Sequence, residues 1–534
     1  MYNNFTWRHH MKYSAHDVKV NISDIKRFGE YGALLRKLSL DDEDISDLVI
    51  ERRSLDSRLH ESKGIFYVYT VSFEATKALK GKDISPAKNS AVIMPQAKKV
   101  SFKTKPVIVG SGPAGLFCAL RLTEHGIAPV IIEKGKDIQA RTRDVDALMG
   151  NGILDTDSNI QFGLGGAGTF SDGKLRTRIK SPFLKYVMEG FVRFGADRSI
   201  LYEAKPHIGT DKLREIVSAM KSYLTDSGCE FRFSTALTGI NTANRRIAGI
   251  VVNDREEIAC DRLVIAAGNA SRDIFSILDG IGTVLTAKPM AVGVRVEHDK
   301  EIIDRYNYGR YCGDPILPVS DCTLTYKDAS GRGVYTFCSC PGGYVINSST
   351  EKGLICVNGM SYSDRGNHLT NSAFVVSVTP QDYPGTGPLA GVEFQRLIER
   401  AAFDNGPGGY IAPSMSVADF MNISAAEHCD ASILPGTYPA DITQILPDII
   451  TEPLRNAFVE FRGKIRGFEC GIITAPETRT SSPVRIDRDR TTFMSISTEG
   501  LYPIGEGAGY AGGIVSSAVD GAACAEAIAS AAES

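Results

Sequence analysis

A glycine-rich turn is the first feature of this sequence that could hold a cofactor. The turn consists of Gly110, Ser111, Gly112, Pro113, Ala114 and Gly115. A short apolar run precedes it, and the spacing of apolar residues in Leu116–His125 predicts a helix after it. Gly110 would allow the tight turn, Gly112 would let the backbone approach a pyrophosphate, and Gly115 would let helix and strand pack closely. The N–H groups at the start of the helix would then face the phosphates.

A second apolar run ends in Glu133, directly before Lys134. Strand, helix and strand in so short a stretch predict a parallel sheet. A carboxylate at the end of the second strand can accept hydrogen bonds from both ribose hydroxyls of an adenosine. This context favours a dinucleotide site over a glycine-rich turn without a ligand, but NAD and FAD both contain ADP.

Three later segments favour FAD. Gly163–Leu175 is rich in glycine, which suits a backbone lying against a large flat ring, although a flexible surface loop has the same composition. The apolar run ending in Ala266-Ala267-Gly268 suits close backbone approach. Near the end, Glu506 could bind a ribityl hydroxyl, and a helix led by Gly512-Gly513-Ile514 could stabilise negative charge on the reduced flavin.

Four side chains are candidates for moving protons or electrons. Asp172 and Lys174 lie within the glycine-rich loop, where they could exchange a proton with a substrate or simply form a solvated ion pair. Cys338 and Cys340 could act as a thiol relay, form a strained disulfide or bind zinc with other cysteines. Packing as small hydrophobic side chains in a buried strand is the reading that we favour for both cysteines.

Arginines offer a site for an anionic substrate, because a guanidinium suits a carboxylate. Arg295, Arg365 and Arg479 are the candidates. Arg479 is favoured, since it lies in a polar segment where the chain returns to the predicted flavin domain. His298, His368 and His428 are isolated in the sequence, and a structural or surface role is predicted for each.

The composition describes the protein that must position these groups. The chain has 534 residues, of which 43 % are hydrophobic and 23 % charged, with a formal net charge of −3. This balance is typical of a globular protein of several domains and gives no reason to expect a nucleic-acid or membrane partner. No apolar run is long enough to cross a membrane, Met1–His10 is polar, and the 11 cysteines are an odd number. A cytoplasmic protein with reduced thiols is therefore predicted.

Residues 12–80 predict a small α+β unit. Apolar spacing predicts a helix over Ile25–Leu40, and aromatic and β-branched residues predict a strand over Gly64–Phe73. The acidic run Asp41–Asp44 is expected to be a solvated helix start, and Lys82–Lys105 a linker. The mild basic balance of this region favours a solvated face over an RNA-binding surface.

Together these motifs resemble the flavoprotein superfamily with two dinucleotide-binding domains. More closely, the chain is similar over nearly its whole length to a bacterial family of FAD-dependent dehydrogenases. The stretches that carry this resemblance are Arg52–Arg58, Phe162–Leu175, Pro289–His298, Phe337–Val345, Asn358–Ser361 and Tyr502–Gly521. The resemblance implies FAD and a fold, but no defined substrate.

The resemblance also implies roles for individual residues. Arg141 would contact the pyrophosphate or nearby backbone, and Leu237 would make a backbone contact to adenine. Glu506 stands where an aspartate is commoner at the ribityl position, which keeps the carboxylate but moves it by one methylene. The residues expected to bind FAD non-covalently are Gly110, Ser111, Gly112, Pro113, Ala114, Gly115, Glu133, Lys134, Arg141, Gly165, Gly166, Gly168, Thr169, Leu237, Ala267, Gly268, Gly505, Glu506, Gly512, Gly513 and Ile514.

The predicted fold class is α/β with three parts. Residues 1–100 would form a small ferredoxin-like α+β domain with a linker. Residues 101–285 and 470–534 would form one Rossmann-type FAD-binding domain from two chain segments. Residues 286–469 would form an α+β substrate domain inserted between them, with the active site where it covers the flavin.

The function predicted from these features is an FAD-dependent oxidoreductase. It would act as a dehydrogenase or reductase on a small organic substrate, for which an anion is a candidate class, by hydride transfer at flavin N5. No second glycine motif is present for a nicotinamide domain, so NAD(P)H could serve only as a transient electron partner. One alternative is a flavin monooxygenase, and another is a flavoprotein whose N-terminal module binds RNA or a protein.

Overall fold

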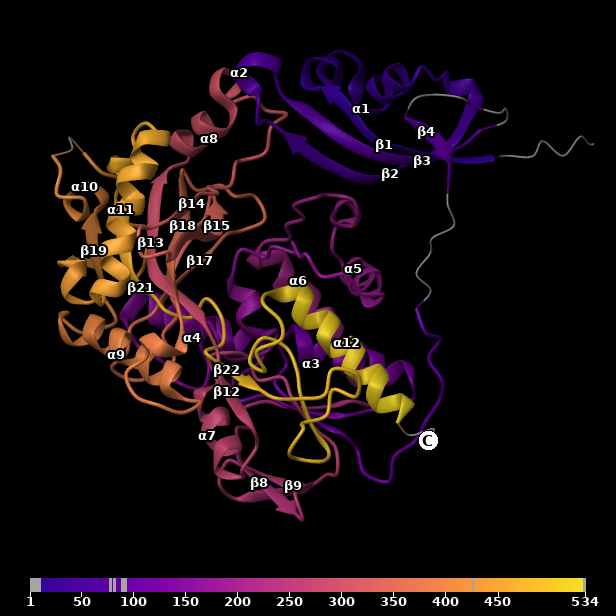
Figure 1. Cartoon of the computed structure of the whole chain (residues 1–534). Coiled ribbons are helices and arrows are strands. Elements are labelled where there is room, and N and C mark those ends of the chain that lie inside the picture. Colours follow the sequence, from indigo (N-terminus) through magenta and orange to yellow (C-terminus); the bar gives the residue numbers. More distant parts are fainter. Residues whose placement is uncertain (1–10, 76–78, 80–82, 88–93, 425–426, 532–534) are drawn as a thin grey trace, which may run out of the picture. The chain divides into compact units, whose positions relative to one another are not determined.

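The computed structural model describes residues 11–75, 79, 83–87, 94–424 and 427–531 of the chain (Figure 1). The chain divides into two compact units. The first comprises Met1–Ile93, Asp197–Pro206 and Asp304–Ser320. The second comprises Met94–Ala196, His207–Ile303 and Asp321–Ser534. Every residue singled out above as a candidate site residue lies in the second unit.

An antiparallel sheet with the strand order β2-β3-β1-β4 forms the centre of the first unit. Its strands are β1 (Met11–Asn21), β2 (Ile45–Asp56), β3 (Phe66–Ala75) and β4 (Ile84–Pro86). Helix α1 (Ile22–Leu38) joins β1 to β2, and its Leu34 is fully buried in one cluster with Val71 of β3. The short helix α2 (His60–Lys63) lies between β2 and β3.

The predicted helix and strand of this unit are confirmed as α1 and β3, but two expectations are wrong. The acidic run does not start a helix: Asp42–Asp44 forms a single 3₁₀ turn that leads into β2. The predicted linker is not wholly irregular, because Ile84–Pro86 pairs with Tyr13–Ala15 of β1 as an edge strand. The ferredoxin-like assignment of this domain stays a prediction.

Two segments from later in the chain belong to the first unit. Arg53 Nε donates a hydrogen bond of 2.7 Å to Glu203, and the Arg53 backbone N–H bonds to the carbonyl of Tyr202 at 2.7 Å. The hydroxyl of Tyr67 donates to the carbonyl of Ile316 at 2.9 Å. The unit is therefore built from three separate stretches of sequence.

A parallel five-stranded sheet organises the first part of the second unit. Its strands, in the order β23-β11-β5-β6-β7, are β23 (Leu501–Pro503), β11 (Leu263–Ile265), β5 (Val107–Val109), β6 (Val130–Ile132) and β7 (Glu230–Arg232). The central strands are buried on both faces, which explains their unbroken apolar triplets. Helix α3 (Pro113–Glu124) follows β5, and the C-terminal helix α12 (Ile514–Ser530) runs beside it (Figure 1). The predicted α/β, Rossmann-type architecture is confirmed.

Close approach explains two glycines of the turn between β5 and α3. Gly110 has φ of 102°, and a Cβ on it would lie 2.5 Å from the carbonyl oxygen of Ala266 at the end of β11. A Cβ on Gly115 would lie 2.0 Å from the carbonyl oxygen of Gly110. Larger residues at either position would push the helix away from the sheet.

The remaining elements around this sheet are helices and one small sheet. The helices are α4 (Ile138–Asn151), α5 (Phe183–Arg193), α6 (Thr210–Asp226) and α7 (Arg272–Gly280). The antiparallel strands β8 (Leu237–Ala243), β9 (Arg246–Val252) and β10 (Glu256–Ala259) form a separate three-stranded sheet.

A mixed seven-stranded sheet organises the rest of the second unit. Its strands, in the order β14-β15-β18-β13-β21-β19-β20, are β14 (Thr325–Lys327), β15 (Gly333–Pro341), β18 (Leu369–Val378), β13 (Met290–Asp299), β21 (Ile472–Glu477), β19 (Ala412–Ser416) and β20 (Thr437–Pro439). Two antiparallel pairs accompany it: β16 (Tyr344–Asn347) with β17 (Val357–Met360), and β12 (Leu285–Ala287) with β22 (Val484–Ile486). The helices here are α8 (Lys300–Tyr308), α9 (Ala390–Asp404), α10 (Val417–Phe420) and α11 (Asp448–Lys464).

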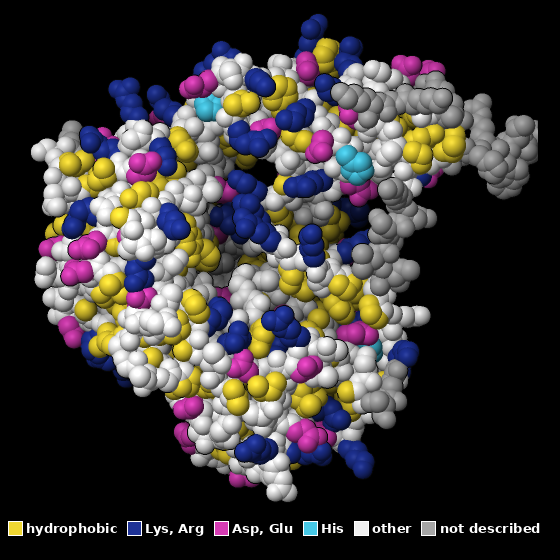
Figure 2. Space-filling view, in the orientation of Figure 1, with side chains coloured by type: hydrophobic (Ala, Val, Ile, Leu, Met, Phe, Trp, Pro, Cys, Tyr) yellow, Lys and Arg dark blue, Asp and Glu magenta, His cyan; other side chains and the backbone are white. Residues whose placement is uncertain are grey.

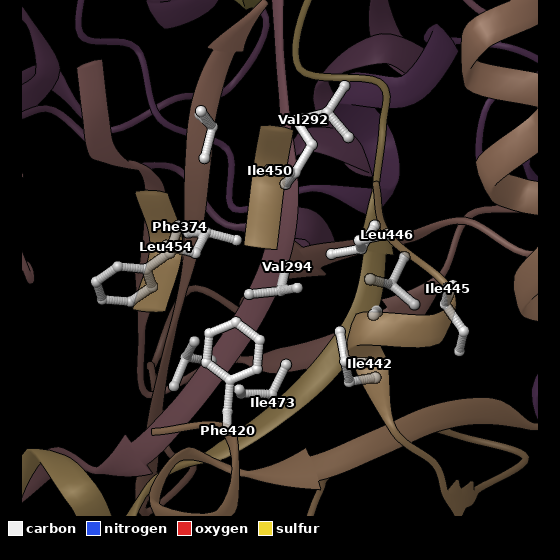
Figure 3. Close-up of a cluster of buried hydrophobic side chains, with 14 of the residues drawn as sticks. Val292, Val294, Phe374, Phe420, Ile442, Ile445, Leu446, Ile450, Leu454 and Ile473 are labelled. Atoms are coloured by element: carbon white, nitrogen blue, oxygen red, sulfur yellow. The ribbon is translucent and has the colours of Figure 1, made fainter. Parts of the chain in front are cut away.

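One face of this sheet carries the largest apolar core. Val292 and Val294 of β13 lie among Phe374 of β18 and Ile450 and Leu454 of α11 (Figure 3). Because side chains alternate along a strand, the residues between these valines face the other way. That second face carries the polar groups described below.

Candidate functional site

The glycine turn leaves the start of α3 ready to bind an anion. Gly112 is the N-cap residue and Pro113 the first helical residue, where a missing N–H costs nothing. The first amides of a helix have no acceptor within the helix, and the helix dipole adds positive charge at this end. The geometry is the one that the sequence predicts for a dinucleotide pyrophosphate.

Glu133 holds the loops around this turn together. One carboxylate oxygen accepts from the Ser111 N–H (2.9 Å) and hydroxyl (2.7 Å). The other accepts from the N–H groups of Gly135 and Gly163, both at 3.0 Å. Each oxygen thus already serves two protein donors, and the contact to a ribose stays a prediction.

Arg141 fixes the glycine-rich loop from inside the protein. Its side chain is fully buried, and it donates to the carbonyls of Asn159, Ile160 and Leu164 at 2.8 Å and to the Thr169 hydroxyl at 2.6 Å. Burial lowers the pKa of Arg141 to about 9. The resemblance implies that Arg141 contacts either the pyrophosphate or nearby backbone, and the described structure contains the contact to backbone.

The loop that Arg141 supports lies directly against the glycine turn. The Gly165 N–H donates to the carbonyl of Ser111 at 2.9 Å. A Cβ added to Gly112 would come within 3.8 Å of the Gly166 Cα. The 3₁₀ helix Gly166–Phe170 then leads the chain to Asp172.

The C-terminal segment completes this side of the site. Glu506 accepts from Asn269 Nδ2 at 2.7 Å and from the Gly513 N–H, at the N-cap of α12, at 3.3 Å. Burial, with a smaller contribution from the negative charge of Cys338, raises the pKa of Glu506 to about 7. A Cβ on Gly268, Gly512 or Gly513 would meet nothing within 4 Å, so the backbone is open to a ligand at these points. An anion-binding helix start, open backbone and a half-buried carboxylate fit the diphosphate, ring and ribityl chain of FAD.

The other residues predicted to touch FAD occupy less informative positions. Lys134 forms ion pairs with Asp273 (3.2 Å) and Asp157 (3.3 Å). Leu237 is buried at the start of β8, and Ala267 follows β11. Their contacts to the cofactor stay predictions.

Asp172 is the centre of a buried charged cluster. It is 1 % exposed, and its Oδ1 accepts from the Ser361 hydroxyl at 2.6 Å. Its Oδ2 lies 3.5 Å from Lys174 Nζ and 3.6 Å from an Arg365 terminal nitrogen. The His207 Nε2 lies 3.8 Å from Asp172 Oδ1 and 3.1 Å from the Ser361 hydroxyl. A single β-bridge between Lys174 and His207 aligns their two segments.

Electrostatics fixes the charges of this cluster at neutral pH. Burial alone would raise the pKa of Asp172, but Lys174 and Arg365 outweigh it and hold that pKa below its ordinary value. Burial opposes the charge on Lys174, yet Asp172 and then Cys338 raise its pKa. Burial and then Arg365 lower the pKa of His207 to about 4, so its imidazole is neutral.

Two atoms of the cluster have no hydrogen-bond partner among the described residues. They are Asp172 Oδ2 and Arg365 Nε, both shielded from solvent. Buried polar atoms are nearly always paired, so unpaired atoms in two side chains that form an ion pair with each other are exceptional. They are the clearest sign of a ligand position in this part of the protein.

Cys338 and Cys340 differ from each other, contrary to the expectation that both pack as small hydrophobic side chains. Strand β15 has an irregular register between Phe337 and Cys340, and Cys338 has φ of 43°. Cys340 is fully buried and its thiol approaches the Cys338 carbonyl at 3.5 Å, whereas Cys338 is partly exposed. The Cys340 thiol, followed by the Lys174 and Arg295 cations, lowers the pKa of Cys338 against the effect of burial.

Arg295 supports this bulge from the polar face of β13. It donates to the Cys338 carbonyl at 2.7 Å and to Asn371 Oδ1 at 2.9 Å. It also pairs with Glu477 through two nitrogens. Its guanidinium is fully buried and occupied by protein, which leaves it no role in binding substrate.

Arg479, the arginine favoured from the sequence, is occupied as well. It donates to both oxygens of Glu399, at 3.0 and 2.8 Å, and to the Thr350 hydroxyl at 2.6 Å. Glu399 also pairs with Arg272 at 2.7 Å, so one fully buried carboxylate joins two arginines. The geometry therefore does not favour Arg479 as a substrate ligand, and Arg365 is the better candidate.

Three residues of the cluster were missed or passed over. His207 and Ser361 received no role from the sequence, and Arg365 was ranked below Arg479. No local signal distinguishes them, because they meet Asp172 only through folding. The described residues contain no group of side chains arranged to hold a metal ion, and none of their helices could cross a membrane.

Comparisons with known proteins agree with this geometry. Residues 108–169 match the model of the NAD(P)-binding Rossmann-like domain, and residues 289–480 match the C-terminal domain-like region of FAD-dependent proteins. An uncharacterized protein from Clostridium beijerinckii is 40 % identical over 505 residues, covering 92 % of this chain and 94 % of that protein.

Solved structures are similar only at a low level. The flavin-dependent brominase Bmp2 is 13 % identical, with a TM-score of 0.36, covering 80 % of this chain and 79 % of its own. A geranylgeranyl bacteriochlorophyll reductase-like protein from Thermoplasma acidophilum is 13 % identical, with a TM-score of 0.37, covering 80 % and 78 %. These values carry no functional argument. The long match shows that the chain belongs to the same family as the Clostridium protein, and the domain models identify this family as FAD-dependent proteins, with FAD as cofactor.

Proposed function

We propose that this protein transfers a hydride between FAD and a small organic substrate, and that the Asp172 cluster handles the accompanying proton. The observation that carries the proposal is the pair of unpartnered buried atoms, Asp172 Oδ2 and Arg365 Nε. They mark a place where a substrate group can hydrogen bond within a shielded, charged environment.

Two observations support placing this cluster next to the flavin site. The loop that reaches Asp172 is the one that lies against Gly112 and is held by Arg141. Cys338 links the two regions electrostatically: it raises the pKa of Lys174 and, with burial, that of Glu506. Lys174 and Glu506 therefore lie within electrostatic reach of the same thiol.

The chain's own residues would bind, orient and deprotonate the substrate. FAD supplies the acceptor or donor of the hydride. Asp172 can take a proton from a substrate group at Oδ2, while Ser361 keeps its other oxygen in place. His207 is neutral and donates its Nε2–H to the Ser361 hydroxyl, which in turn donates to Asp172, so it helps to hold Ser361 in place. Lys174 and Arg365 keep Asp172 ionised before the substrate arrives.

The test is anaerobic bleaching of the flavin. The purified protein should release FAD on acid treatment. Its absorbance near the flavin maximum should fall with at least one member of a panel of alcohols, 2-hydroxy acids and amino acids. In the reverse direction, NADH or NADPH should reduce the flavin, and a 2-oxo acid or an enoate should reoxidise it. An FAD-loaded protein that none of these compounds reduces or reoxidises would contradict the proposal. Substrate-dependent NAD(P)H oxidation that consumes oxygen would replace it with a monooxygenase.

A matched pair of variants assigns the proton step. Asp172→Asn should keep its FAD and slow substrate-dependent flavin reduction by about 10²- to 10⁴-fold, the usual contribution of a general base. Asp146→Asn alters an exposed aspartate on α4 and should react at the parent rate. Equal rates for the two variants would remove Asp172 from the mechanism.

A further inference from the structure

We infer that the substrate is a small carboxylate bearing a hydroxyl or amino group on the adjacent carbon, bound between Arg365 and Asp172. The inference rests on the proposed function and adds the chemical class of the substrate. It is based on three charged side chains, Asp172, Lys174 and Arg365, which lie close together without hydrogen bonding to one another.

The distances in the cluster are those of ion pairs that lack hydrogen bonds. Asp172 Oδ2 lies 3.5 Å from Lys174 Nζ and 3.6 Å from Arg365, longer than the usual 2.7–2.9 Å of a charge-assisted hydrogen bond. The Arg365 side chain is 17 % exposed, and no side-chain hydrogen bond joins it to another described residue. A largely buried guanidinium with free donors is suited to a carboxylate, which it can bind through two parallel hydrogen bonds.

The loop that carries Arg365 is firmly held. Ser363 N–H and hydroxyl bond to Asp211 at 2.8 and 2.6 Å, and Asn367 Nδ2 donates to the Gly343 carbonyl at 2.7 Å. Arg365 itself has φ of 51°, an unusual conformation for a residue other than glycine. The free guanidinium is therefore presented by a braced backbone, as a preorganised binding group requires.

Asp172 defines the second half of the ligand. An ionised carboxylate can only accept hydrogen bonds, so Oδ2 requires a donor. A ligand that places an anion on Arg365 and a donor on Asp172, whose atoms are only 3.6 Å apart, must carry the two groups on neighbouring carbons. A 2-hydroxy acid and a 2-amino acid share this arrangement.

The reaction of such a substrate balances with the groups present. The O–H or N–H bond breaks and its proton passes to Asp172. The adjacent C–H bond breaks and its hydride leaves to FAD, the oxidant that the family supplies. A C=O or C=N bond forms in the product, a 2-oxo acid or an imino acid that water hydrolyses to it.

Binding of the carboxylate would also prepare the base. Arg365 contributes to the low pKa of both His207 and Asp172. A substrate carboxylate on Arg365 would offset that positive charge, so both groups would gain proton affinity when the substrate is in place. The site would thus become a better base only when it is occupied.

A basic loop next to the cluster suits an anionic substrate. Arg176, Arg178 and Lys180 follow Lys174 at alternate positions, are exposed, and form no ion pair with the acidic residues that the structure describes. Figure 2 shows Lys and Arg side chains gathered near the middle of the face in view. Such a potential raises the local concentration of anions and their rate of association.

Calorimetric titration of the FAD-loaded protein tests the inference. The probes are glycolate, lactate and phenyllactate, and glycine, alanine and phenylalanine, so that either source of the donor and several side-chain sizes are covered. Propionate and 3-phenylpropionate lack the donor, and 2-propanol lacks the carboxylate. At least one hydroxy or amino acid should bind at least tenfold more tightly than its unsubstituted counterpart and perturb the flavin spectrum.

A matched pair of variants locates the contact. Arg365→Gln should weaken that binding by about 10- to 100-fold while the FAD content is kept, as expected for the loss of a charge-assisted pair. Arg365→Lys should recover part of it, and Arg490→Gln, which changes an exposed arginine, should bind like the parent. Equal binding by Arg365→Gln and the parent, or no binding by any hydroxy or amino acid, would overturn the inference. Flavin that is still reduced or reoxidised by another compound class would then leave the proposed function intact.

Discussion

Replacing Arg141 by leucine tests whether one buried guanidinium holds the flavin loop in place. The side chain is fully buried and serves three carbonyls and one hydroxyl, all between Asn159 and Thr169. Leucine fills part of the space but offers no donor, so these buried acceptors lose their partners. Each unsatisfied buried polar group costs about 1–3 kcal/mol, and relaxation or water entry reduces the sum. A loss of about 3–5 kcal/mol is expected, the range found when one partner of a buried charged network is removed.

Thermal unfolding followed by flavin fluorescence and circular dichroism measures this loss. One kcal/mol corresponds to about 2–4 °C of Tm in domains of 150–250 residues. The low value of about 2 °C applies here because the unit is larger, so Arg141→Leu should lower Tm by roughly 6–10 °C. Its FAD content should fall in parallel, since the loop lies against Gly112. Arg143→Leu, on the same helix but exposed, is the control and should unfold within about 1 °C of the parent.

The result also separates the two contacts that the resemblance implies for Arg141. A stable Arg141→Leu protein that no longer retains FAD would mean that the guanidinium serves the pyrophosphate, and the reasoning from its carbonyl partners would be refuted. A stable protein with normal FAD content would refute both roles. Loss of stability already in the FAD-free protein supports the structural role.

Four further outcomes follow from the geometry. Arg479→Gln should lower Tm, because it leaves the buried Glu399 with one cation fewer. The same variant should bind carboxylates as tightly as the parent in calorimetry, and a binding defect would restore Arg479 as a substrate ligand. Iodoacetamide at pH 7 should label Cys338 faster than Cys429 and Cys470, because its neighbours lower the pKa of Cys338 while burial raises the pKa of the other two; peptide mapping of a Cys338→Ser control would expose a wrong assignment. Gly112→Val should abolish FAD retention with the fold intact by circular dichroism, since a Cβ meets no protein atom closer than 3.8 Å; normal FAD content would argue against a pyrophosphate here. Burial lowers the pKa of His298 to about 4, below its value near 6.5 in the unfolded chain. Its contribution to stability is therefore present above pH 6.5 and is lost as the pH falls to 4. The fall in Tm over that interval should be shallower in His298→Asn, and an unchanged slope would contradict this.

The flavin site could be predicted because its determinants are consecutive in the sequence. The turn Gly110–Gly115 works through backbone conformation and the start of one helix, which a few neighbouring residues specify. Glu133 was identified for the same reason, at the end of the next strand. Its four hydrogen bonds to loop amides could not be foreseen, because Gly163 reaches it from thirty positions further along the chain.

The charged cluster could not be predicted in the same way. Asp172 and Lys174 were recognised by their position in the loop, but His207 and Ser361 join them only through contacts between distant segments. Arg479 illustrates the opposite error. Its polar neighbourhood in the sequence suggested a free guanidinium, and its actual partner Glu399 is far away in the chain, on α9.

The two cysteines show why local periodicity fails at a bulge. Positions i and i+2 of a regular strand share a face, so Cys338 and Cys340 were treated alike. The irregular register of β15 and the positive φ of Cys338 break that equivalence. One thiol is fully buried, and the other is partly exposed between cations.

Strand β13 connects the protein's stability to its chemistry. Its valines pack against α11, while Arg295, between two of them, braces the Cys338 bulge from the opposite face. Core packing and the position of Arg295 depend on the same strand register. A register shift of one residue would exchange the two faces of β13 and place valines where Arg295 pairs with Glu477. The apolar core therefore sets the register in which Arg295 meets the bulge. Cys338 in turn raises the pKa of Lys174, which belongs to the cluster where a substrate is proposed to bind.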